Sequence, residues 1–123
     1  MPVERADEHP IFEAGGNTVT SFAAPSRGAT EAALFRTEVP PGGGIPKHHH
    51  DHLDVFTLER GSCTFHLGEE IVELAAGDSA VVPTGVWHHL EAGHEGATIT
   101  VVMLGGTRFI REDGSASVLP WLS

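Results

Sequence analysis

The sequence is short of several residue types, and each shortage narrows what the protein can be. Cys63 is the only cysteine, so no disulfide can form within the chain. There is no tyrosine, which removes one common acid–base group. Lysine and arginine number 7 against 17 aspartates and glutamates, and the net charge of −10 disfavours nucleic acid and anionic membrane surfaces as partners.

Long apolar runs are also missing. No stretch is long enough to span a bilayer, and the polar residues 1–10 contain no apolar segment of a secretory signal. We therefore expect a cytoplasmic protein with no membrane partner. A reducing cytosol would keep the single thiol free and would keep iron in the Fe(II) state.

The pattern along the chain predicts strands rather than helices. Glycine and proline interrupt the sequence about every ten residues, and the runs between them are rich in Val, Thr, Phe and Leu. Nine strands are expected, at residues 18–23, 32–39, 53–59, 63–67, 71–74, 79–82, 88–92, 97–104 and 108–111. Short strands at this spacing favour a sandwich or barrel. We expect one all-β domain over residues 17–112, between a loose arm at 1–16 and a tail at 113–123.

The most informative feature is a set of four potential metal ligands: His48, His50, Asp54 and His88. Imidazole suits Zn, Cu, Fe and Ni, and a carboxylate widens the choice toward Mn. Three of the four, with His52 between them, share the i, i+2 parity of one face of an extended strand. The same parity continues through Phe56 and Leu58. The sequence therefore predicts a divalent metal site that opens onto an apolar interior.

These ligands stand in two spaced patterns that resemble the conserved motifs of the cupin superfamily, G-x5-H-x-H-x3,4-E-x6-G and G-x5-P-x-G-x2-H-x3-N. The first motif matches at Gly42, His48, His50 and Gly61, and the second matches at Gly77, Pro83, Gly85 and His88. The resemblance covers residues 42–92 and the flanking strands. It implies a single jelly-roll barrel (a double-stranded β-helix) with the metal inside its mouth. It also implies that two copies pair as a homodimer.

The chain departs from the two motifs at two positions. Asp54 stands where the family has glutamate, so a carboxylate shorter by one methylene must reach further or bind through a water. His52 is near enough to compete as a ligand, although a role facing the substrate is the preferred interpretation. Ala92 replaces the asparagine of the second motif, which is not a metal ligand in the family.

A small, partly apolar pocket is expected beside the metal. The residues predicted to line it are His52, Phe56, Leu58, Phe65, Leu67, Leu90 and Met103. The histidines of opposite parity, His49, His66 and His89, are expected at the rim or on the outer face, with no part in the metal site.

Three functions fit these residues. The preferred hypothesis is an oxygenase of small enolic or aromatic compounds. Fe(II) is its expected metal, and Mn2+, Ni2+, Zn2+ and Cu2+ are the alternatives. The resemblance to quercetin dioxygenase-like cupins implies that Asp54 acts as a catalytic base as well as a ligand. One alternative is a non-oxidative isomerase or cyclase resembling polyketide cyclase-like cupins. The other is a cupin that binds a small molecule without catalysis.

Overall fold

The computed structural model describes residues 3–123, which form an all-β jelly roll. Its strands are β1 (Ile11–Ala14), β2 (Asn17–Ala23), β3 (Ala32–Val39), β4 (Gly44–His50), β5 (Asp54–Leu67), β6 (Glu70–Ala75), β7 (Ser79–Val82), β8 (His88–Leu104), β9 (Phe109–Arg111) and β10 (Ala116–Ser117). Three short 3-10 turns, η1 (Ala6–Glu8), η2 (Pro25–Arg27) and η3 (Pro120–Leu122), complete the fold. Across the described residues, no helix is long and apolar enough to cross a membrane.

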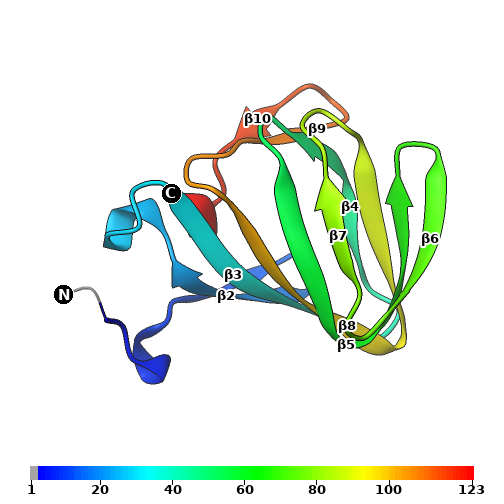
Figure 1. Cartoon of the computed structure of the whole chain (residues 1–123), viewed down its shortest axis with the longest axis horizontal. Helices are drawn as coiled ribbons and strands as arrows, with labels where there is room; N and C mark the ends of the chain where they lie inside the picture. The colour runs from blue at the N-terminus through cyan, green and yellow to red at the C-terminus, as the bar shows by residue number, and fades with distance from the viewer. Residues whose placement is uncertain (1–2) are drawn as a thin grey trace.

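All strand pairs are antiparallel, and two long strands organise them. β8 pairs with β3 through residues 97–104, with β4 through part of residues 88–91, and with β5 through both of its halves. β5 also pairs with β6 and β7. Figure 1 shows the sheet curling around these two strands, with β2 and β3 on one side of the curve and β4 and β6 on the other. The curl creates an interior that one flat sheet could not enclose.

The curl depends on a close backbone contact between β5 and β8. Gly61 has φ of +81°, and the β5–β8 register shifts on both sides of it. A Cβ at Gly61 would lie 2.0 Å from the carbonyl oxygen of Gly96 on β8. Only glycine allows the two strands to approach so closely at this bulge. The glycine that ends the first motif is therefore a requirement of the barrel's shape.

Strand alternation separates an apolar interior from the outside. The interior holds a continuous core that includes Phe35, Phe56, Leu58, Phe65 and Val101. Leu58 is fully buried, at 0% exposure. Cys63 is also buried, and burial raises the pKa of its thiol to about 11, which keeps it protonated and unreactive.

Several strand predictions need correction. The two strands expected at 53–59 and 63–67 are one strand, β5, which begins at Asp54, and those expected at 88–92 and 97–104 are one strand, β8. The glycines that separated them in the sequence mark bulges and bends, so pairing continues past them. The strand β4 was not among the nine expected strands, although the sequence placed His48 and His50 on one face of an extended ligand strand.

The two ends of the chain pack onto the barrel. The expectation of a loose arm at residues 1–16 is wrong for Ile11–Ala14, which pair with β2 as strand β1; residues 1–2 lie outside the described part. In the tail, Leu122 is fully buried, and Trp121 packs against Phe12 and Phe35 at ring-centroid distances of 5.8 and 6.3 Å. Both ends therefore serve the chain's own core.

Two glycine substitutions test this account of the curl. Gly61→Ala should lower the free energy of unfolding by more than about 3 kcal/mol, because the new methyl group would collide with the Gly96 carbonyl. Gly77→Ala is the matched control. Gly77 also has positive φ, +99°, but nothing lies within 4 Å of its Cβ position, so only backbone strain of about 1–2 kcal/mol is expected. Urea denaturation of both variants gives the comparison, and equal losses would contradict it.

Candidate metal centre

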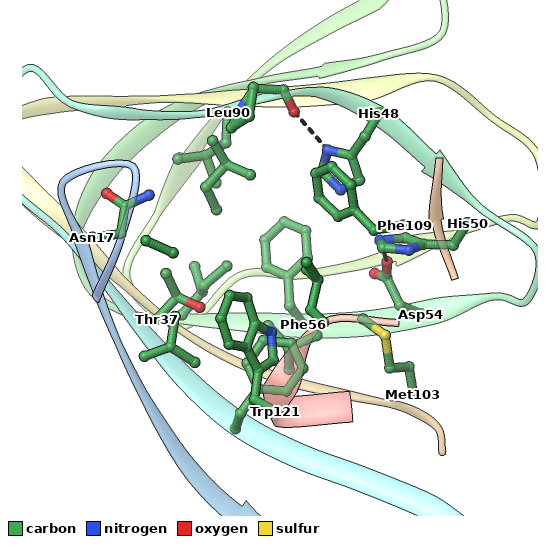
Figure 2. Close-up of a pocket in the computed structure, with 18 of the residues that line it drawn as sticks. Asn17, Thr37, His48, His50, Asp54, Phe56, Leu90, Met103, Phe109 and Trp121 are labelled. Carbon is green, nitrogen blue, oxygen red and sulfur yellow. Dashed lines mark hydrogen bonds and ion pairs between the residues drawn. The ribbon is translucent and has the colours of Figure 1, made fainter. Parts of the chain in front are cut away.

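Strand pairing brings the three histidines of the motifs together. His48 on β4 lies directly opposite His88 on β8, and His50 follows two residues after His48 on the same face. The ring centroid of His48 lies 4.2 Å from that of His88 and 4.8 Å from that of His50. The ligand nitrogens of all three lie within 4.8 Å of one another, and all three residues are buried. Figure 2 shows His48 and His50 with Asp54 at one end of the pocket.

The outer nitrogen of each ring is tied to the backbone. The Nδ1 atoms of His48, His50 and His88 face the carbonyl oxygens of Pro46, Arg108 and Val86, the last two at 3.1 and 2.9 Å. A carbonyl only accepts, so each Nδ1 must carry the hydrogen. The Nε2 lone pairs are then free and converge. This is the arrangement that a bound metal ion requires of histidine ligands, so the donor set fits a divalent metal.

Asp54 adds a carboxylate beside the three imidazoles. Its Oδ2 atom lies 3.3 Å from Nε2 of His50 and 3.9 Å from Nε2 of His88. Asp54 is outside the group whose ligand atoms all lie within 4.8 Å of one another. The shorter side chain thus places its oxygen on the His50 and His88 side of the centre.

The predicted single ligand strand is wrong. β4 ends at His50, a turn occupies residues 51–53, and β5 begins at Asp54. Asp51 fixes this turn, because its carboxylate accepts hydrogen bonds of 2.8 and 2.9 Å from N and Nε of Arg108. His52 projects from the turn to solvent and contacts Asp51, so it lies outside the pocket it was expected to line.

Burial shifts the pKa values of the three histidines and of Asp54. It lowers the pKa of His48 to about 3 and that of His88 to about 4, and it lowers the pKa of His50 as well. Burial raises the pKa of Asp54 from 3.8 to about 7. At neutral pH the imidazoles are therefore neutral, with lone pairs available to a cation. A metal ion would favour the ionised carboxylate.

The centre opens onto a cavity of about 270 Å³. Phe56, Phe65, Leu90 and Met103 line it, as expected from the sequence, together with Trp121. Figure 2 shows Phe56 and Trp121 beside the pocket, with the metal-ligand candidates at one end of it and Asn17 at the other. Leu58 and Leu67 were also expected in the lining, but Leu58 packs in the core and Leu67 against it, away from the cavity.

Sequence reasoning missed two lining residues on β9. Phe109 pairs in register with His50 and stacks on the His48 ring at 3.9 Å. Arg111 pairs in register with His48, and its guanidinium carbon lies 5.1 Å from the Phe109 ring centroid. Of the cavity-lining residues that the structure describes, Arg111 alone carries a formal positive charge. The sequence predicted that Phe109 and Arg111 alternate on one strand. It did not predict that this strand pairs with the one that carries His48 and His50.

Removing one ligand tests the centre. His88→Ala should lower the bound metal by an order of magnitude or more while keeping the β-sheet circular dichroism, because the sheet does not need this imidazole to pair. His49→Gln is the matched control, since His49 lies on the opposite face of β4 and packs against Trp87. Elemental analysis after purification without chelator gives the metal content. Equal metal in both variants would contradict the assignment.

Comparison with known proteins identifies the family to which the chain belongs. A family model described as the cupin domain matches residues 35–105, more than half of the chain. No curated protein matches the sequence. Among solved structures, an RmlC-like cupin from Shewanella frigidimarina is similar, with 22% identity, a TM-score of 0.72, and coverage of 92% of this chain and 95% of that one.

Two further structures share the fold at lower identity. KdgF from a Halomonas species is 18% identical with a TM-score of 0.70, and the match covers 89% of this chain and 94% of that one. Oxalate decarboxylase from Bacillus subtilis, described with its Mn(II) centres, is 19% identical with a TM-score of 0.73; the match covers 92% of this chain and 31% of that one. The motifs, the barrel and the family model agree, and the chain belongs to the cupin family.

Proposed function

We propose that this cupin is a metal-dependent oxygenase of small enolic or aromatic compounds, with Fe(II) as its metal. The observation that carries the proposal is the union of three free imidazole nitrogens and one carboxylate with a mainly apolar cavity. A bound Fe(II) would supply open coordination positions for the reactants. The three histidines and Asp54 would hold it, and the chain's other residues bind and orient the substrate.

The cavity suits a flat molecule with one oxygen-bearing end. Phe56, Phe65 and Trp121 provide aromatic surface, and Leu90 and Met103 fill the gaps between them. Arg111 offers donors to an anionic oxygen, since one guanidinium nitrogen donates to the Ser117 hydroxyl at 2.9 Å and the others have no side-chain acceptor among residues 3–123. An enolate or a carboxylate would therefore be oriented with its oxygens toward the metal centre and its ring in the apolar part.

Asp54 is placed to move a proton. Its carboxylate is buried, lines the cavity and lies against His50 and His88. A hydroxyl group that enters beside the metal centre would meet this carboxylate, which can accept its proton while the imidazoles hold the ion. Asparagine keeps the shape of the side chain but cannot accept the proton in this way.

A non-oxidative reaction is the second candidate. An isomerisation or ring closure needs no oxygen. The metal centre would serve as its electrophile, the buried carboxylate of Asp54 as its proton acceptor, and Arg111 as the group that binds an anionic oxygen. The similarity to oxalate decarboxylase, whose name denotes a decarboxylation, supports keeping this candidate. Binding without catalysis is the third outcome, and absence of turnover with every compound would favour it.

Oxygen uptake separates these candidates. The Fe(II)-loaded protein should consume oxygen with members of a panel of catechols, flavonols and β-diketones. Asp54→Asn should lose turnover on the order of 10²-fold while keeping much of its metal, because the proton acceptor is removed. Glu69→Gln, on the exposed β5–β6 turn, is the control and should match the wild type. Unchanged product formation under strict anaerobiosis would replace the oxygenase by the isomerase or cyclase.

We also propose that two copies of the chain pair. The outer face of the sheet carries an apolar stripe in register, formed by Leu34, Val102, Val55 and Val81. Three of these side chains are 37–56% exposed, and burying them against a second copy would remove apolar surface from water. Since the arm and the tail pack on their own chain, the stripe is the better interface.

Light scattering should give a particle mass of about twice 13.0 kDa, and Val102→Glu should halve that mass. A 13.0 kDa particle at every concentration would refute pairing.

A further inference from the structure

A second group of metal-binding side chains lies on the outer face of the barrel. His66 on β5 stands directly opposite His89 on β8, and Glu91 follows two residues after His89 on the same face. Successive residues of a strand point to opposite faces, so His89 is turned away from the inner centre to which its neighbour His88 contributes. The two groups of side chains are therefore separated by the sheet.

The geometry of this outer group is close to that of a ligand set. Nε2 of His66 lies 3.4 Å from Oε2 of Glu91, and the ring of His89 stacks on that of His66 at a centroid distance of 3.9 Å and an angle of 12°. One ligand atom from each residue lies within 4.8 Å of the other two. Two ligands at roughly 2.1 Å from a tetrahedral ion are about 3.4 Å apart. The His66–Glu91 spacing already has this value.

We propose that His66, His89 and Glu91 form a second divalent-cation site, of the borderline-soft class that Zn2+ represents. Two imidazoles and one carboxylate match the ligand preference of Zn2+, and a water molecule would complete the tetrahedron. His66 keeps 22% of its side-chain surface exposed and Glu91 63%, so an ion can enter without opening the fold.

An ordinary ion pair does not account for the whole group. A contact between His66 and Glu91 needs only one ring, yet the second ring is stacked on the first. Thr64 lies opposite Glu91 but donates its hydroxyl to Glu73 at 2.8 Å, so it does not occupy the Glu91 carboxylate. The site would link β5 to β8 by a metal ion on the face of the sheet opposite the cavity, and it does not depend on the proposed oxygenase activity.

Zinc titration of four full-length proteins tests the proposal. After metal removal, Zn2+ is added with a chromophoric competitor, and thermal unfolding confirms that each protein is folded. The wild type should bind two equivalents, and His66→Gln should bind one. His94→Gln, which removes an exposed histidine elsewhere on β8, should still bind two. The double variant His48→Ala/His50→Ala, without the inner ligands, should bind one.

The outcomes separate this site from the inner one. If the wild type and the double variant each bind one equivalent and His66→Gln binds none, the outer site stands and the inner metal centre fails. If His66→Gln binds as much zinc as the wild type, or if the double variant binds none, the outer site is refuted. Should His66→Gln not fold, Glu91→Gln replaces it, because Glu91 is exposed and its loss leaves the core intact; the same loss of one equivalent is expected.

Discussion

The pairing of β5 with β8 is the constraint on which the rest of the molecule depends. These two strands run against each other through both halves of the barrel and bend at one place, where the Gly61 and Gly96 backbones touch. The bend places residues 54–58 and 97–103 on one wall and residues 63–67 and 88–92 on another. The cavity is the space between these walls, and the candidate metal ligands gather where β4 and β9 close its mouth.

The chemistry of the mouth follows from how the fold treats polar groups. Three buried imidazoles would be costly in an apolar interior, but each gives its Nδ1 hydrogen to a carbonyl oxygen. What remains unpaired in each ring is a single lone pair, and these point toward one another. The protein thus concentrates its uncompensated electron density at one point beside an apolar cavity. A cation is the partner that such a point can accept most readily.

Much of this could be predicted from the sequence, and the failures have physical causes. The shared face of His48 and His50 could be predicted from their spacing on a strand, and the family from the resemblance of the two motifs. The strand lengths could not be predicted in this way, because Gly61 and Gly93 look like breaks in the sequence but lie within continuous strands. The pairing of β9 with β4 depends on a contact between distant segments, so Phe109 and Arg111 could not be placed at the mouth in advance. His52 was misplaced because the Asp51–Arg108 hydrogen bonds, which end the ligand strand, also join distant segments.

The hydrogen bonds of His48 and His88 have one more consequence. Both rings bond the carbonyl two residues earlier in their own segment, Pro46 and Val86 respectively. Their orientation is therefore a local property of two tripeptides, whereas that of His50 relies on Arg108, 58 positions away. Over evolutionary time the surrounding loops and cavity walls can drift without turning these two rings. Of the three imidazoles, the one whose orientation is most sensitive to such drift is that of His50.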